Sequence, residues 1–161
     1  MHLTLRTNLA LRALMVCAVN PSHLVRKQDV ADVINASGNH LAQVINKLAQ
    51  SGFITTQRGR HGGFKLARPA STIAVGDVFR VFEADLPLVE CFSDHNTCPL
   101  QEHCRMGPHL KRAVDAFYDA LSDLSLSDLT ECNSGLEQIL HLEGPRLPQS
   151  CPSQKHVMAD A

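Results

Sequence analysis

The segment from residue 38 to residue 53, GNHLAQVINKLAQSGF, restricts the fold more than any other part of the sequence. Its apolar residues recur at the i, i+3, i+4 and i+7 spacing that is typical of one helix face. They are Leu41, Val44, Ile45 and Leu48. Gly52 follows and is suited to the left-handed backbone that ends many helices. The spacing predicts a helix over 38–50 with one apolar face and one polar face.

The segments on either side of this helix indicate its place in the fold. An apolar helix is expected over 7–19 and a short amphipathic helix over 27–35. Two short β-type runs, FITTQ and GFKLA, follow the 38–50 helix and flank the glycine-rich stretch RGRHGG. The order helix, helix, turn, helix, hairpin is that of a winged helix-turn-helix. In this interpretation 38–50 is the recognition helix and RGRHGG is the tip of the wing.

Polar and basic side chains concentrate on these two elements. Asn and Gln pair with adenine in the major groove, and a wing arginine can reach a phosphate or the minor groove. The predicted DNA contacts are Asn39, His40, Gln43, Lys47, Arg58, Arg60 and His61. Residues 1–70 hold nine Lys and Arg and two acids, a net charge of +7, whereas the remainder of the chain has −8. A basic half favours double-stranded DNA as the partner over the alternative of a merely solvated polar face.

The second half of the chain predicts a different module. A short helix is expected around 75–82, and a long helix over 108–125 has apolar residues in alternating steps of four and three. That seam is typical of a helix that pairs with a second copy, although it could also pack on its own domain. We expect a DNA-binding domain over 1–71, a loop and dimerisation helix over 72–142, and a disordered tail over 143–161. No apolar run is long enough for a membrane span, and a cytoplasmic protein is expected.

Three cysteines, Cys91, Cys98 and Cys104, lie in one loop with the spacing C-x6-C-x5-C. Thiolates bind iron–sulfur clusters and zinc, and a reducing compartment disfavours disulfides. The fourth ligand is open from the residues alone, and the nearby histidines are His95, His103 and His109. A zinc-stabilised interaction protein therefore stays an alternative. Cys17 is expected in the apolar core, and we assign no role to Cys132 and Cys151.

Several stretches together resemble the Rrf2 family of winged-helix regulators. They are HLTLRTNLALRAL, the run from NHLAQVINKL to VFRVFE, LVECF with the cysteine loop, and AVDAFYDALSDLSLSDL, which together span residues 1 to about 140. Within the family the chain is most similar to NsrR, the nitric-oxide-sensing repressors. The resemblance implies a homodimer on a two-fold operator and an iron–sulfur cluster on the three loop cysteines. The cluster would be 4Fe–4S, with 2Fe–2S as the alternative, and nitric oxide would relieve repression by attacking the iron.

Asn8 departs from the pattern of that resemblance. Some NsrR members have an Asp at this position, donated by the partner subunit as the fourth ligand, and an amide replaces a carboxylate poorly. Asn8 is instead similar to RirA, the iron-responsive members, so an iron or cluster-availability signal is the second hypothesis. The sequence has no phosphate-binding glycine loop after a strand and no nucleophile elbow, and we expect no enzyme.

Overall fold

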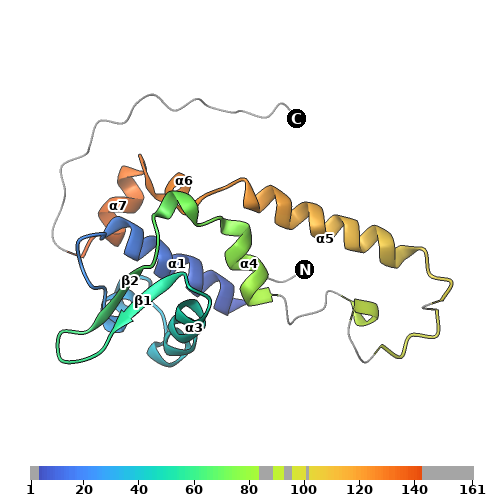
Figure 1. Cartoon of the computed structure of the whole chain (residues 1–161), viewed down its shortest axis with the longest axis horizontal. Coiled ribbons are helices and arrows are strands. Elements are labelled where there is room, and N and C mark those ends of the chain that lie inside the picture. The colour runs from blue at the N-terminus through green and yellow to red at the C-terminus, as the bar shows by residue number, and fades with distance from the viewer. Residues whose placement is uncertain (1–3, 84–88, 93–95, 101, 143–161) are drawn as a thin grey trace.

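The computed structural model describes residues 4–83, 89–92, 96–100 and 102–142, and its elements are drawn in Figure 1. The helices are α1 (Leu5–Val19), α2 (Lys27–Val33), α3 (Gly38–Gln50), α4 (Val75–Glu83), α5 (Met106–Ser122), α6 (Leu126–Thr130) and α7 (Ser134–Leu140). The strands are β1 (Ile54–Gln57) and β2 (Gly63–Leu66), and two short 3-10 helices are η1 (Ala70–Thr72) and η2 (Glu90–Phe92). The expected class, mainly helical with one β-hairpin, is confirmed.

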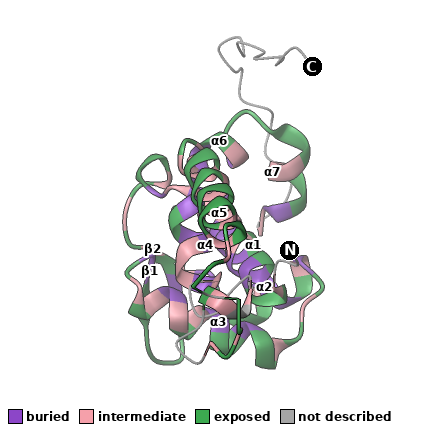
Figure 2. Cartoon of the chain, turned by 90° about the vertical axis from the view of Figure 1, so that its right-hand side faces the viewer, coloured by how far each residue is buried: buried purple, intermediate pink, exposed green. Residues whose placement is uncertain are grey.

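Helix α1 is the centre of the core. Ala13, Leu14 and Val16 have no exposed surface, and five of the other twelve α1 residues are buried as well. Helices α3, α4, α6 and α7 and strand β2 all contact α1, and Figure 2 shows α1 surrounded by these elements. Because α1 is apolar on more than one face, it can be covered from several sides at once.

The helix-turn-helix forms as the spacing predicts. Helix α2 ends at Val33, two residues earlier than expected, and Asn35 then turns the chain with φ +50. Leu41, Val44 and Leu48 are the buried residues of α3 and pack its apolar face on the core. Gly52 takes φ +73 and ends α3 with the expected left-handed residue.

The hairpin is antiparallel and packs on the core through one aromatic side chain. Its register pairs Ile54 with Leu66 and Gln57 with Gly63. Phe64 is 3 % exposed and makes an isolated bridge to Val25, which comes just before α2. A Cβ on Gly63 would meet the backbone oxygen of Val25 at 2.7 Å, so the close approach of these two segments requires glycine.

Helices α4 and α5 cross where Gly76 presses against the C-terminal turns of α5. A Cβ on Gly76 would meet the backbone oxygen of Tyr118 at 2.7 Å and also the Ser122 side chain. Arg80 on α4 also contacts α5 at this crossing. Its Nη1 donates to Ser122 Oγ at 2.7 Å, and its Nη2 is paired with Asp119 Oδ1 at 2.9 Å. Beyond the crossing α5 projects from the rest of the chain (Figure 1), and none of its residues is buried.

Two segments of the second half differ from the expectation. The long helix begins at Met106 and ends at Ser122, whereas we expected 108–125. The stretch SLSDLT, for which no helix was expected, contains α6. Ser125 and Asp128 cap that helix reciprocally, with Asp128 N donating to Ser125 Oγ and Ser125 N donating to Asp128 Oδ2. A five-residue helix is too short to show a hydrophobic period, so only its cap was visible in the sequence.

The C-terminal helix α7 is held to α1 by a buried amide. Asn20 Nδ2 donates to Leu140 O at 2.9 Å, and Asn20 Oδ1 accepts from Leu142 N at 3.1 Å. The tail expected over 143–161 lies outside the described residues. No helix within the described ranges is long and apolar enough to cross a membrane.

Replacement of Gly76 by Ala should destabilise the protein by about 1–3 kcal/mol, because the added methyl group overpacks the α4–α5 crossing against backbone atoms. Urea unfolding of the purified protein measures this difference.

Gly107→Ala is the matched control, since Gly107 lies in α5 and a Cβ there has nothing within 4 Å. We expect the control to leave the free energy of unfolding unchanged or slightly raised. Equal stabilities of the Gly76 variant and the control would contradict a tight crossing.

Candidate nucleic-acid interface and cysteine loop

The polar face of α3 lies on the surface, opposite its packed face. Asn39, His40 and Gln43 are exposed, and Lys47 is half-buried. The buried stripe of α3 points into the core, so helical geometry directs Asn39 and Gln43 outward. The structure therefore presents four of the predicted DNA contacts on one surface-facing helix.

Two of these side chains are also held by neighbouring helices. Arg6 Nη2, on the first turn of α1, donates to Gln43 Oε1 at 3.3 Å. Lys47 Nζ lies 5.5 Å from the centroid of the Phe82 ring on α4. A groove of about 540 Å³ lies between these helices. Its lining residues are Thr4, Leu5, Arg6, Leu9, His40, Gln43, Lys47 and Phe82. The side chains predicted to read DNA thus depend on α1 and α4 for their positions.

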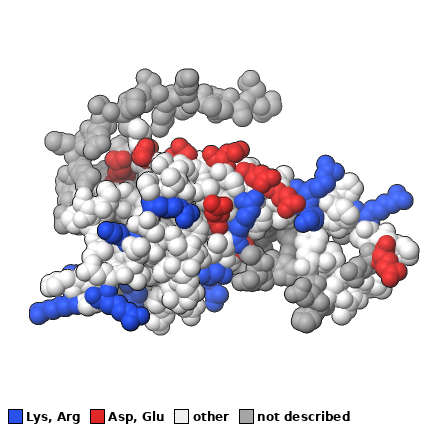
Figure 3. Space-filling view, viewed as in Figure 1, with Lys and Arg blue, Asp and Glu red and all other residues white. Residues whose placement is uncertain are grey.

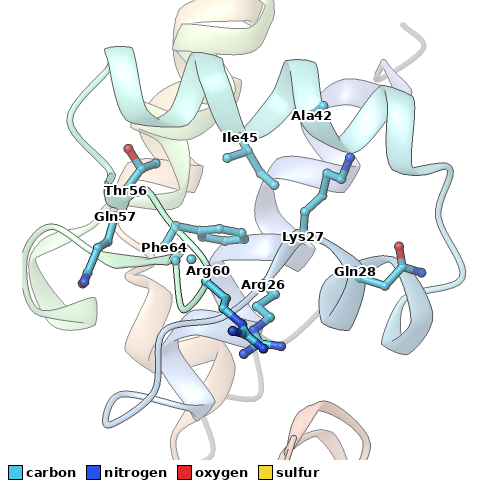
Figure 4. Close-up of a pocket in the computed structure, with 11 residues that line it drawn as sticks. Arg26, Lys27, Gln28, Ala42, Ile45, Thr56, Gln57, Arg60 and Phe64 are labelled. Carbon is cyan, nitrogen blue, oxygen red and sulfur yellow. The ribbon is translucent and has the colours of Figure 1, made fainter.

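The three predicted DNA contacts on the wing differ in their surroundings. Arg58, Arg60 and His61 are all exposed at the hairpin tip, where Gly59 takes φ +114. Arg60 turns back into a groove between the hairpin, α2 and α3, as Figure 4 shows. Arg58 and His61 do not line that groove.

Charge separates across the molecule in the way that the two halves of the sequence suggest. In Figure 3 Lys and Arg gather at the lower left, where the hairpin lies in Figure 1, and Asp and Glu follow the upper edge. Further Lys and Arg lie at the right, over the projecting part of α5. The acids of residues 1–70, Asp29 and Asp32, are both on α2. The face with α3 and the wing is therefore suited to a polyanion.

The three loop cysteines are half-buried free thiols. Cys91 lies in η2, and Cys104 comes two residues before the start of α5. Figure 1 places the loop beyond the projecting end of α5. Cys98 N donates to Asn96 Oδ1 at 2.9 Å, whereas Asn96 Nδ2 is buried without a hydrogen-bond partner in the described part of the loop.

The structure does not bring the three thiols into a closed site. Within the described ranges, no three His, Cys, Asp or Glu side chains are placed to hold a metal ion. Of the candidate histidines, His103 and His109 are exposed and His95 lies outside the described residues. In donor chemistry the loop still fits an iron–sulfur cluster, because it combines free thiols with an unsatisfied N–H donor, Asn96 Nδ2, of the kind that bonds to cluster sulfur.

The other predicted positions lie apart from the loop. Asn8 is exposed on α1, within the body of the fold, while the loop lies at the far end of α5 (Figure 1). Cys17 is 2 % exposed in α1, and burial raises the pKa of its thiol to about 12, as befits a core residue. Cys132 lies between α6 and α7 with φ +58, and Cys151 is outside the described residues.

Sequence reasoning missed one residue, Glu83, that joins the end of α4 to the start of α1. Glu83 Oε1, at the end of α4, accepts hydrogen bonds from Thr4 N at 3.0 Å, from Thr4 Oγ1 at 2.9 Å, and from Thr7 Oγ1. Burial alone would raise the pKa of Glu83, but the hydrogen bonds from Thr7 and Thr4 together lower it. A lone Glu at the end of an amphipathic helix carries no sequence signal for this contact.

Comparison with known proteins agrees with this architecture. Residues 3–132 match the Rrf2 family, described as an iron-dependent transcriptional regulator. The chain is 36 % identical over 151 residues to Protein aau3 of Rhizobium meliloti (strain 1021), which covers 93 % of this chain and 98 % of that protein.

Solved structures of regulators share the fold. T. potens IscR aligns with a TM-score of 0.63 at 23 % identity, over 80 % of this chain and 85 % of that chain. CymR of B. subtilis, a global cysteine regulator, aligns with a TM-score of 0.62 at 22 % identity, over 81 % and 96 %. A putative transcriptional regulator from Listeria innocua gives 0.64 at 27 % identity, over 83 % and 88 %.

The family match covers most of the sequence and includes α3, the wing, the cysteine loop and α5. Members of this family are transcriptional regulators that bind DNA and typically act as dimers, so the expectation of a non-enzyme is confirmed. The chain belongs to the Rrf2 family of winged-helix transcriptional regulators.

Proposed function

We propose that the protein is a dimeric repressor of the NsrR type, whose DNA binding depends on an iron–sulfur cluster that senses nitric oxide. The observation that carries the proposal is the set of three free, half-buried thiols, Cys91, Cys98 and Cys104, in the loop that leads into α5. Cysteine thiolates are the protein ligands that such clusters use most often.

In the DNA-bound state α3 lies in the major groove and the wing lies against the adjacent backbone and minor groove. Asn39, His40 and Gln43 contact base edges, and each well-formed bidentate pair contributes about 1–3 kcal/mol of discrimination. Lys47 contacts phosphate, while Arg58 and His61 extend from the wing tip.

Dimerisation uses the exposed side of α5. Met106 is 61 % exposed, and the next apolar residues of the stripe, Leu110 and Val114, are only half-buried within one chain. The C-terminal part of the stripe is occupied by α4, since the rings of Phe117 and Phe79 lie 6.0 Å apart. A two-fold pair of α5 helices would present two recognition helices to a two-fold operator.

The loop cysteines would hold the cluster, with 4Fe–4S preferred and 2Fe–2S as the alternative. A bound cluster would supply iron with which nitric oxide can react, and the three thiolates would be linked only while they hold it. The fourth ligand is proposed to come from the Asn8 region of the partner subunit, because Asn8 is exposed on α1 and can face a second chain.

We infer that Glu83 and Phe82, at the end of α4, connect the cysteine loop to the recognition helix. Cys91 follows Glu83 by eight residues, and Glu83 holds the first turn of α1, from which Arg6 bonds Gln43. Release of the loop would loosen α4 and α1 together and change the spacing of the two recognition helices. Only a few kcal/mol of differential stability is needed to shift such an equilibrium.

An iron-responsive regulator of the RirA type is the second candidate. It is favoured by Asn8, because an amide is a weaker iron ligand than a carboxylate and a weakly held iron would be lost first when iron is scarce. The iron-dependent description of the family agrees with it.

Native mass spectrometry of protein purified without oxygen tests these proposals. A dimer with an iron–sulfur mass that converts to iron-nitrosyl adducts supports the nitric oxide sensor. A cluster that ignores nitric oxide but is lost to an iron chelator supports the iron-responsive regulator. One zinc per chain in colourless protein would overturn both in favour of a structural zinc site.

Replacement of Cys98 by Ala should remove the cluster and weaken binding to operator DNA, because two thiolates cannot retain it. Iron analysis and a DNA-binding titration measure the two effects. Cys17→Ala is the control, since the buried Cys17 thiol is no ligand in this proposal. Full iron content in the Cys98 variant would refute the ligand assignment.

Replacement of Asn8 by Asp should slow the loss of iron to a chelator by at least several-fold if residue 8 of the partner subunit completes the site. A carboxylate binds iron more strongly than an amide does. The rate of chelator-induced bleaching measures the effect, with Asn39→Asp, on the exposed face of α3, as the control for added charge. Identical bleaching rates for the Asn8 variant and the unmodified protein would exclude residue 8.

Replacement of Glu83 by Gln should weaken operator binding while the iron content stays the same, because α1 loses its anchor on α4. The pKa of Glu83 is lowered below 4.5 in the folded chain. Its stabilising effect is therefore present above that pH and is lost as the pH falls through the folded-state value. Unfolding at pH 6 and at lower pH should show a smaller decline for the variant than for the unmodified protein.

Glu131→Gln, at an exposed position after α6, is the control for removal of a carboxylate. If the Glu83 variant and this control bind DNA alike and follow the same pH dependence, Glu83 does not connect the loop to α1.

A further inference from the structure

A basic groove lies between the two elements that are proposed to read DNA. It has a volume of about 480 Å³ and is bounded by the start of α2, one side of α3 and the hairpin. Figure 4 shows its lining residues. They are Arg26, Lys27, Gln28, Ala42, Ile45, Thr56, Gln57, Arg60, Gly62, Gly63 and Phe64.

The groove holds three cations, and none of the described residues that line it is acidic. The two carboxylates of α2 are engaged within that helix. Asp29 Oδ2 accepts from Arg26 N at 3.0 Å, and Asp32 Oδ1 accepts from Gln28 Nε2 at 2.8 Å. Positive charge in the groove is therefore not neutralised by its own lining.

The Arg26 and Arg60 side chains line the same groove although their charges repel each other. In Figure 4 the Arg26 and Arg60 side chains extend toward the same point at the mouth of the groove. Like charges at close range are unfavourable unless an anion lies between them, and the planar guanidinium fork matches phosphate oxygens. The arrangement is that of an anion site supplied by two separate elements, α2 and the wing.

The walls of the groove let a polymer backbone approach closely. Phe64 is 3 % exposed and forms part of the floor with Ala42 and Ile45, and these side chains offer no competing charge. Gly62 and Gly63 line the hairpin side and carry no side chains that would block a strand from entering.

The position of the groove identifies which anion it suits. The major and minor grooves of DNA are separated by one sugar–phosphate strand. A protein that places α3 in the major groove and its wing tip at the minor groove must therefore straddle that strand. The groove lies between α3 and the hairpin, where the strand would pass.

We propose that Arg26, Lys27 and Arg60 form a clamp for the phosphates of the DNA strand that passes between α3 and the wing. The inference rests on the proposed placement of α3 in the major groove. It changes the role of Arg60 from a possible minor-groove reader to a backbone contact and leaves the minor groove to Arg58 and His61. Because phosphates are the same in every sequence, the clamp fixes position and affinity and not sequence preference.

Fluorescence titrations of the full-length dimer with two 30-base-pair duplexes test the clamp. One duplex has mixed sequence, and the other is selected by the protein from a random pool. The salt range runs from about 50 to 200 mM, over which phosphate contacts dominate the change in affinity. Arg26→Gln, Lys27→Gln and Arg60→Gln should each weaken binding to both duplexes by the same factor. Each should lower the salt slope by about 2, because one phosphate contact is lost from each protomer of the dimer.

Two matched variants separate the clamp from other effects. Arg112→Gln removes the same charge from an exposed position on α5 and should leave the salt slope unchanged. Asn39→Ala should lose affinity for the selected duplex alone. The melting temperature of the Arg26 and Arg60 variants should be unchanged or higher, because one of two repelling charges is gone.

The outcomes distinguish the clamp from the function on which it rests. If the unmodified protein prefers neither duplex, the proposed function itself fails. If it prefers the selected duplex but Arg60→Gln keeps the full salt slope, the clamp alone is overturned. A loss confined to the selected duplex would also overturn it, since Arg60 would then read bases.

Discussion

Burial of α1 is the interaction on which the rest of the structure depends. Its residues Ala13, Leu14 and Val16 have no exposed surface, and the helix contacts elements from both halves of the chain, from α3 to α7. Full burial of one large aliphatic side chain is favourable by about 1.5–3 kcal/mol. The burial of a helix on several sides is therefore large compared with the small net free energy of unfolding of a protein. The same surface that stabilises the fold thereby sets where α3, the hairpin and α4 lie relative to one another.

In the proposed mechanism, this packing would let the α3 surface and the cysteine loop influence each other within one chain. Arg6 extends from the first turn of α1 to Gln43 on α3, while Glu83 at the end of α4 holds the same turn through Thr4. These contacts are partly exposed hydrogen bonds, which individually contribute about 1 kcal/mol. Hydrogen bonds of this strength can favour one orientation of α3 and can also be broken. The apolar face of α3 would remain packed on the core when they break.

Much of the fold could be predicted because local signals and burial agree there. The stripe of α3, the left-handed Gly52 and the glycine-rich hairpin each follow from residue type and spacing alone. The side-chain geometry could not be predicted in the same way. Arg58 and Arg60 are alike in sequence, yet only Arg60 lines the groove beside α2. Its direction depends on the packing of the hairpin through Phe64 onto Val25, which is a contact between distant segments. Glu83 was missed for the same reason, since its partner Thr4 is separated from it by 79 positions in the sequence.

The α4–α5 crossing fixes the positions of these two helices relative to each other. Because Gly76 lies against backbone atoms of α5, the two helices cannot slide past each other without losing the Arg80 contacts and the Phe79–Phe117 pair. In the proposed mechanism, a movement of the projecting end of α5 would be passed to α4, because the two helices would move as one unit. Helix α4 ends at Glu83, which holds the first turn of α1, so the displacement would continue to Arg6 and its bond to Gln43 on α3. A change in ligation at the proposed cluster site would then alter the spacing of the two recognition helices of the proposed dimer.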